Sequence, residues 1–66
     1  MELTINGKER SFDPPLTVAQ LLEQLQLEPE RVVVELNRRI LPPETLSEAV
    51  LNSGDSLELV HFVGGG

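Results

Sequence analysis

The chain has 66 residues, enough for one small domain, and a net charge of −6 at pH 7. It contains no cysteine, which excludes a disulfide framework, a zinc ribbon and a cysteine nucleophile. Five basic against eleven acidic side chains argue against nucleic acid as a partner, because such binding requires a basic surface that neutralises phosphates.

A β-hairpin is predicted at the start of the chain. Residues 2–5 read ELTI and alternate polar and apolar side chains, as in a strand with one buried face. Asn6-Gly7 follows, and this pair is a strong signal for a tight hairpin turn because both residues tolerate positive φ. Residues 8–12, KERSF, then return as the second strand.

An amphipathic helix is predicted after residues 13–16, where two consecutive prolines interrupt the strand pattern. Thr17 and Gln20 have the spacing of a capping box at a helix start. Pro29 limits the length of the helix, so we expect about three turns. Apolar residues recur at every third or fourth position, at Val18, Leu21, Leu22 and Leu25.

The second half of the chain consists of short predicted elements. Residues 31–37, RVVVELN, indicate a strand rich in β-branched residues, and 38–41, RRIL, a short paired strand. Residues 45–51 carry apolar side chains at the spacing of a short helix. After a turn at 52–55, the sequence SLELVHFV at 56–63 predicts the last strand.

This order of elements predicts an α+β fold with two layers, in which a mixed sheet of four to five strands is covered on one face by one main helix plus a short helix. The N-terminal sequence has no basic stretch followed by an apolar run, so we predict no secretory signal. No apolar run is long enough to cross a bilayer. We therefore expect a soluble cytoplasmic protein, with a domain at residues 1–63 and a flexible glycine tail at 64–66.

The tail, Gly64, Gly65 and Gly66, has no side chains and spans only about 10 Å when extended. It is slim enough to enter a narrow channel in another protein. The Gly66 carboxylate can attack the α-phosphate of a nucleotide, and the resulting acyl adenylate accepts a sulfur or nitrogen nucleophile. Another protein must bind the nucleotide, because the chain lacks a phosphate-binding loop of the Gly-x-x-x-x-Gly-Lys type. The alternative is a frayed end with no function.

Several segments together carry a resemblance to a known family. The hairpin with NGK, the capped helix TVAQLLEQL, the strand VVVELN, the turn GD and the ending VHFVGGG resemble the ThiS family of ubiquitin-like sulfur-carrier proteins of thiamin biosynthesis. The resemblance covers essentially the whole chain. Its most specific part is the strand that runs into the glycines, where Gly65 and Gly66 match the diglycine end of the family and Gly64 extends it.

The resemblance implies a ubiquitin-like β-grasp fold with the first and last strands as parallel neighbours. It also implies that an ATP-dependent enzyme resembling ubiquitin-activating enzymes adenylates Gly66. A sulfur source such as a cysteine desulfurase then supplies the sulfur of a thiocarboxylate, which thiazole synthase accepts into the thiazole ring. In this interpretation the chain is a protein co-substrate rather than an enzyme, binds no cofactor itself, and leaves ATP to the activating partner.

Apolar residues beside the tail suggest where partners dock. Val60 and Phe62 lie on the opposite face of the last strand from Leu57 and Leu59. Our hypothesis is that Val60 and Phe62, with Val33 and Leu41, form an exposed patch that binds the activating enzyme and the synthase. The alternative is that Phe62 packs against a loop as part of the core.

Neither the single histidine nor the acidic residues predict a catalytic or metal site. His61 has no serine, cysteine or second histidine near it in the sequence, so a structural or surface role is expected. The acidic residues are scattered, and no metal-ligand spacing is present.

Three other functions stay open at the level of the sequence. The small subunit of molybdopterin synthase shares the fold, the diglycine end and the thiocarboxylate chemistry. A ubiquitin-like protein modifier uses an activated C-terminus that a lysine attacks. A plain interaction domain would use neither reaction.

Overall fold

The computed structural model of the chain describes residues 1–62. They contain one α-helix, α1 (Val18–Gln24), and two 3₁₀ turns, η1 (Pro29–Arg31) and η2 (Pro43–Thr45). They also contain five strands: β1 (Glu2–Ile5), β2 (Lys8–Ser11), β3 (Val32–Leu36), β4 (Arg39–Leu41) and β5 (Ser56–His61).

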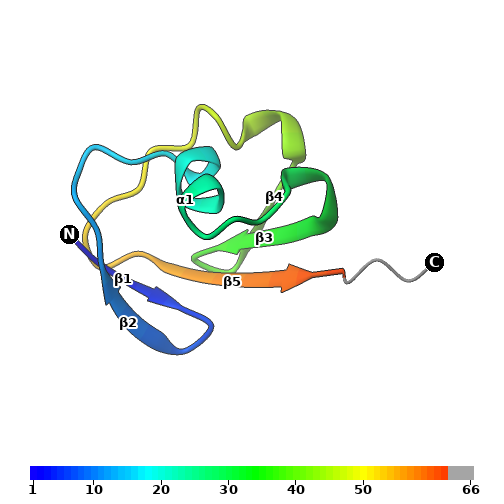
Figure 1. Cartoon of the computed structure of the whole chain (residues 1–66). Coiled ribbons are helices and arrows are strands. Elements are labelled where there is room, and N and C mark those ends of the chain that lie inside the picture. The colour runs from blue at the N-terminus through cyan, green and yellow to red at the C-terminus, as the bar shows by residue number, and fades with distance from the viewer. Residues whose placement is uncertain (63–66) are drawn as a thin grey trace.

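The five strands form one mixed sheet in the order β2-β1-β5-β3-β4. β1 and β5 are parallel neighbours in the middle of the sheet, while the other neighbouring pairs are antiparallel. α1 lies over one face of this sheet, and β5 runs past the end of the β1–β2 hairpin toward the C-terminus (Figure 1). The predicted mixed sheet, covered on one face by a main helix, is confirmed.

Two tight turns connect the antiparallel strand pairs at the edges of the sheet. Asn6 and Gly7 have φ angles of 50° and 83°, as the Asn-Gly signal predicts for a type I′ turn. The β3–β4 turn repeats this geometry with Asn37 at 50° and Arg38 at 71°. Arginine rarely adopts positive φ, so this second turn has a weaker signature in the sequence than the first.

Helix α1 begins as predicted but ends earlier. The Thr17 hydroxyl accepts a hydrogen bond from the Gln20 N–H at 3.1 Å, and the Gln20 side chain accepts one from the Thr17 N–H at 2.8 Å, which completes the capping box. The helix has seven residues, about two turns rather than three. It ends because Gln26 adopts a φ of 61° and the Leu27 N–H bonds back to the Leu22 carbonyl at 2.8 Å, a Schellman closure.

The short helix predicted at residues 45–51 forms only in part, as a 3₁₀ turn that begins earlier and the turns that follow it. A 3₁₀ turn, η2, forms at Pro43–Thr45, and hydrogen-bonded turns follow it, because the Glu48 and Ala49 N–H groups both bond to the Thr45 carbonyl at 3.0 Å. The Leu51 N–H bonds to the Leu16 carbonyl at 2.8 Å, so this segment pairs with the chain before α1 instead of continuing as a helix. Val50 consequently faces solvent.

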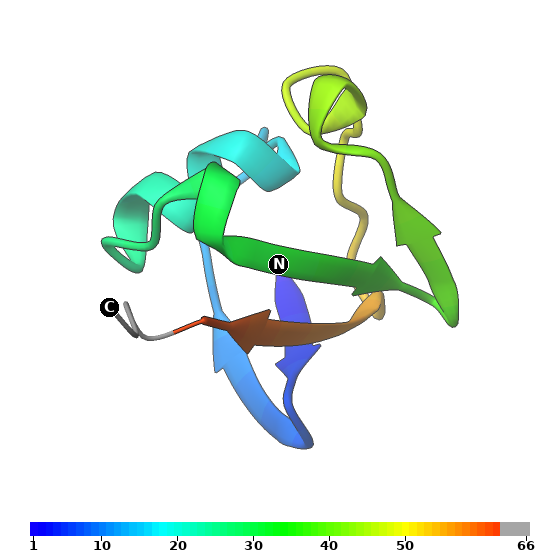
Figure 2. The same ribbon diagram turned by 90° about the vertical axis from the view of Figure 1, so that its right-hand side faces the viewer.

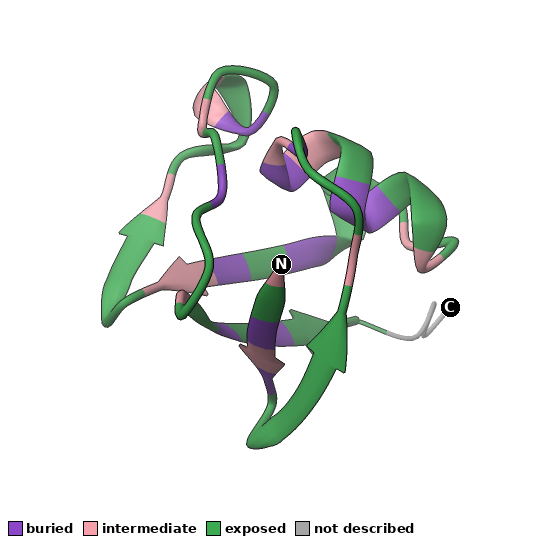
Figure 3. Cartoon of the chain, turned by 90° about the vertical axis from the view of Figure 1, so that its left-hand side faces the viewer, coloured by how far each residue is buried: buried purple, intermediate pink, exposed green. Residues whose placement is uncertain are grey.

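The core lies between α1 and the sheet. Buried residues occur along β1, β3 and β5, whereas the edge strand β2 is exposed throughout (Figure 3). β3 and β5 run side by side beneath the helix layer (Figure 2). The buried residues are all aliphatic: Leu3, Ile5, Leu16, Val18, Leu21, Leu22, Val32, Val34, Leu46, Leu51, Leu57 and Leu59. None of the helices in residues 1–62 has the length and apolar character needed to cross a membrane.

Candidate functional site

The predicted tail lies outside the described residues, so the candidate site is built from the strand that leads to it. Gly64, Gly65 and Gly66, and the domain boundary predicted after residue 63, all fall beyond residue 62. β5 is a central strand whose side chains alternate between the core and the outer face of the sheet. The position of β5 therefore determines where the chain leaves the domain.

On its β3 side, β5 is held up to the last described residue. Val60 and His61 lie opposite Val33 and Val32 in the antiparallel register. The Phe62 N–H then donates to the Arg31 carbonyl at 2.8 Å, one residue beyond the strand. This backbone pairing holds the exit of β5 against β3.

On its β1 side, β5 is held by a side chain after β1 has ended. β1 and β5 share only two register pairs, the last being Ile5 with Leu57. Asn6 then takes the place of a strand residue: its Oδ1 accepts from the Leu59 N–H at 2.7 Å, and its Nδ2 donates to the Leu59 carbonyl at 3.2 Å. The amide side chain of Asn6 thus extends the hydrogen bonding between the hairpin and β5 by two bonds beyond the last backbone pair.

The outer face of the sheet carries an apolar patch beside this exit, formed by Val33, Val60 and Phe62. Val33 and Val60 are direct cross-strand neighbours on the face opposite α1. Phe62 follows Val60 by two residues and is 59% exposed, while Val60 is 55% exposed. The expected exposure of these three side chains is confirmed, and the alternative that Phe62 is a core residue is wrong.

Leu41 does not belong to this patch, contrary to the hypothesis from the sequence. It lies opposite Val34, which is buried, and it packs against the core from the helix-facing side. The neighbouring Ile40 points the other way and is 68% exposed, opposite Glu35 on the outer face. The sequence RRIL does not show whether Ile40 or Leu41 faces outward. The register of β4 against β3 decides between them.

Two carboxylates lie next to the apolar patch without a cationic partner. Glu35 and Glu58 are directly opposite each other on β3 and β5. Within residues 1–62 the single ion pair joins Arg31 and Glu28, so no basic group lies within 4.0 Å of either carboxylate there. Like charges in direct cross-strand pairs are unfavourable, and Arg38 lines the same hollow as the two carboxylates without forming an ion pair with either. Sequence patterns do not reveal this pair, because the two residues are far apart along the chain.

The single histidine lies on the surface, in line with the sequence. His61 is exposed at the end of β5. Across residues 1–62, no three His, Asp or Glu side chains gather closely enough to hold a metal ion.

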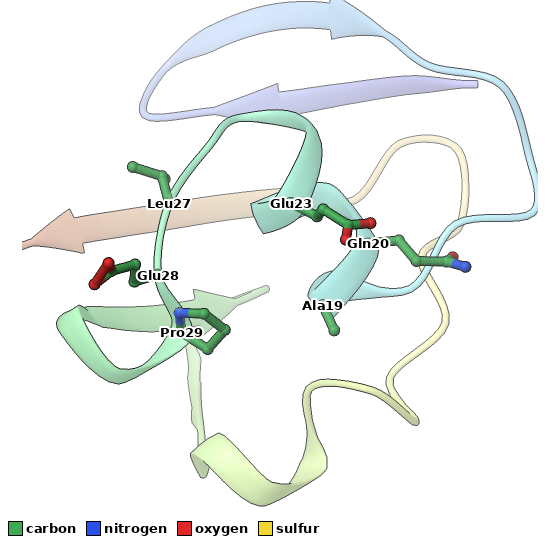
Figure 4. A pocket seen from close by; sticks show the side chains of 6 residues that line it. All are labelled: Ala19, Gln20, Glu23, Leu27, Glu28 and Pro29. Atoms are coloured by element: carbon green, nitrogen blue, oxygen red, sulfur yellow. The ribbon is translucent and has the colours of Figure 1, made fainter.

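A second surface feature lies on the helix side of the molecule. A groove of about 340 Å³ runs along α1 and the segment that follows it (Figure 4). It is lined by Ala19, Gln20, Glu23, Leu27, Glu28 and Pro29. None of the residues predicted for the functional site lines this groove.

Comparisons with known proteins identify relatives over the whole chain. Sulfur carrier protein ThiS of Bacillus subtilis (strain 168) is 42% identical over 65 residues, which cover 97% of this chain and 98% of that protein. A thiazole synthase of Paramagnetospirillum magneticum is 44% identical over 66 residues, and one of Magnetococcus marinus is 36% identical over 66 residues. Both matches cover 100% of this chain but only 20% of the relative, so the chain spans about a fifth of the length of these two proteins.

A solved structure and a family model agree with these relatives. The crystal structure of the thiamine biosynthesis protein ThiS from Geobacter metallireducens matches with a TM-score of 0.84 and 39% identity, over 100% of both chains. The predicted ubiquitin-like β-grasp fold is thereby confirmed. The model of the ThiS family matches residues 3–66, which include the three glycines. On these matches, the chain belongs to the ThiS family.

Proposed function

We propose that this chain is the sulfur carrier for thiazole formation in thiamin biosynthesis. The observation that carries the proposal is the family match through residue 66, which includes the three glycines that follow shortly after β5 in the sequence. β5 itself is a core strand held on both sides. The Bacillus relative named as a sulfur carrier supports the same function. The two relatives named thiazole synthase, each of which contains a segment similar to this whole chain, support thiazole synthase as the acceptor.

The proposed chemistry takes place at the Gly66 carboxylate. An ATP-dependent activating enzyme binds the tail, and a carboxylate oxygen attacks the α-phosphate of ATP and releases pyrophosphate. A sulfur nucleophile then displaces AMP. Sulfide gives the thiocarboxylate directly, whereas a persulfide formed through a cysteine desulfurase gives an acyl disulfide, which a second thiol cleaves to the thiocarboxylate while the two thiol sulfurs form a disulfide. The chain binds no cofactor of its own in this scheme and acts as a protein co-substrate rather than an enzyme.

The outer face of the sheet is the proposed docking surface for the activating enzyme. Val33, Val60 and Phe62 supply exposed apolar area beside the exit of β5, and aromatic side chains are favoured at the centres of interfaces. Glu35 and Glu58 add two negative charges next to it, in a hollow that Arg38 also lines. A partner surface with an apolar centre and basic side chains at its rim fits this arrangement.

The function is tested by intact mass measurement. The chain is incubated with its activating enzyme, ATP and a sulfur source, and then weighed. We expect a mass gain that matches replacement of one oxygen by sulfur, and none when ATP is omitted. Covalent attachment to other proteins would instead indicate a modifier. No change with a demonstrably active enzyme would leave only an interaction domain.

The substitution Phe62→Ala tests the docking surface. The Phe62 side chain is exposed, and its hydrogen bond to Arg31 is made by the backbone N–H, which alanine keeps. We therefore expect the free energy of unfolding to change by less than about 0.5 kcal/mol. Loss of an aromatic anchor should weaken binding to the activating enzyme at least about tenfold. Calorimetric titration gives the affinity, and urea unfolding gives the stability.

Phe12→Ala is the matched control. Phe12 is the other phenylalanine of the chain and packs partly against the core, with Arg10 5.5 Å from its ring centre. This variant should lose stability and keep its affinity for the activating enzyme. A Phe62→Ala variant that loses stability but binds normally would contradict the docking surface.

A further inference from the structure

One edge of β5 is open at His61. Backbone groups of successive residues in a strand point to opposite edges, and the Phe62 N–H bonds to Arg31 on the β3 side. Leu59 is bonded on the other edge by Asn6. The N–H and carbonyl of His61 therefore point to the same edge as those of Leu59. Among residues 1–62, neither group of His61 has a partner on that edge.

Asn6 is the reason that the edge opens at this position. The Asn6-Gly7 turn takes the backbone away from β5, and the Asn6 side chain satisfies Leu59 with bonds of 2.7 and 3.2 Å. The next backbone groups that point to this edge are those of His61, and the hairpin does not reach them. β5 projects past the end of the β1–β2 hairpin (Figure 1). The sheet thus has a central strand whose last residues behave as an edge strand.

The surroundings of this edge suit an added strand. Unpaired N–H and carbonyl groups on an exposed strand are a template for pairing with another chain. Val60 and Phe62 flank His61 and are exposed on the outer face, so they would contact alternate side chains of an added segment. Because Val60 and Phe62 are both apolar, we expect apolar residues in the added segment where its side chains lie on the outer face.

We infer that this edge of β5 accepts an extended backbone segment of thiazole synthase as an additional short strand. The inference rests on the proposed function, since it names the way in which the acceptor holds the chain next to the glycines. Main-chain hydrogen bonds to His61 supply the alignment, and the apolar contacts with Val60 and Phe62 supply further binding area. Thiazole synthase is the partner because two relatives carry a segment similar to this chain within proteins of that name.

The substitution His61→Pro tests the edge. Proline removes the N–H that faces outward and places a ring where the added segment would pair, and an edge strand tolerates it because the N–H makes no ladder bond. We expect the affinity for thiazole synthase, measured by calorimetric titration with the full chain, to fall at least about tenfold. His61→Ala keeps the N–H and removes only the imidazole, so this control should bind within about twofold of the wild type.

A second variant keeps the test decisive if the proline disturbs folding. In a chemically synthesised chain, an ester in place of the Val60–His61 amide removes the same N–H while all side chains stay. This ester should weaken binding by about threefold to tenfold. Wild-type affinity in the ester variant, or equal affinities of the folded His61→Pro and His61→Ala variants, would overturn the strand pairing.

The outcome is separable from that of the proposed function. Sulfur loading of the wild-type chain is measured in parallel by intact mass. A chain that loads sulfur and binds thiazole synthase equally well with and without the His61 N–H refutes the strand pairing alone. A wild-type chain that fails to load sulfur refutes the proposed function.

Discussion

Conversion of the Gly66 carboxylate to a primary amide should abolish sulfur loading, to the level seen without ATP. The amide has nearly the size of the carboxylate, so the tail still fits any channel that accepts the natural chain. It lacks the anionic oxygen that attacks the α-phosphate, and the acyl adenylate cannot form. Intact mass measurement after incubation with the activating enzyme, ATP and a sulfur source gives the result directly.

The control for this amide is the same chemical change at a side chain remote from the tail. Glu44→Gln replaces an exposed carboxylate by an amide in η2 and should load sulfur as the wild type does. Persistent loading of the Gly66 amide would show that another group carries the sulfur, and the proposed function would then be wrong.

The substitution Leu57→Ala should unfold much of the protein. Leu57 is fully buried on the central strand β5, where it lies opposite Ile5 on one side and Leu36 on the other. Truncation of a buried leucine costs about 2–5 kcal/mol, because apolar contacts are lost and a cavity is left. A domain of this size has a stability of about 3–10 kcal/mol in total. Urea unfolding should therefore show a large loss of stability, and a substantial unfolded population if the wild type is at the lower end.

Val60→Ala is the matched control for Leu57→Ala. It truncates an aliphatic residue on the same strand, but Val60 points to the outer face and is 55% exposed. Its free energy of unfolding should change by about 0.5 kcal/mol or less. Equal losses in the two variants would contradict the assignment of the core to the helix-facing side of β5.

Much of the local structure could be predicted from short-range patterns. The Asn6-Gly7 turn and the Thr17 capping box depend on residues at most three apart, and both form as expected. The alternation of Leu57 and Leu59 with Val60 assigns their faces correctly, since side chains on a strand alternate with a period of two. Such features need no knowledge of the rest of the chain.

Two of the errors occur where local patterns compete with contacts between distant segments. Residues 45–51 have helical spacing, but the hydrogen-bonded turns reach only Ala49, and Val50 and Leu51 instead pair with the segment before α1. Leu41 was expected on the outer face, and its pairing with Val34 places it on the core side. α1 is short for a local reason, since Gln26 adopts the left-handed conformation that glycine usually supplies.

The sequence by itself determined the character of the segments: alternating strands, a capped amphipathic helix, an aliphatic core without cysteine, and three successive glycines at 64–66. The tertiary structure alone decided how β5 is held and where it is open. Asn6 and Leu59 are 53 positions apart, so no local pattern predicts that the Asn6 side chain forms the last hydrogen bonds between the hairpin and β5. The physical reason is that side-chain periodicity is a local property, whereas strand register and the edge at His61 depend on hydrogen bonds between distant parts of the chain.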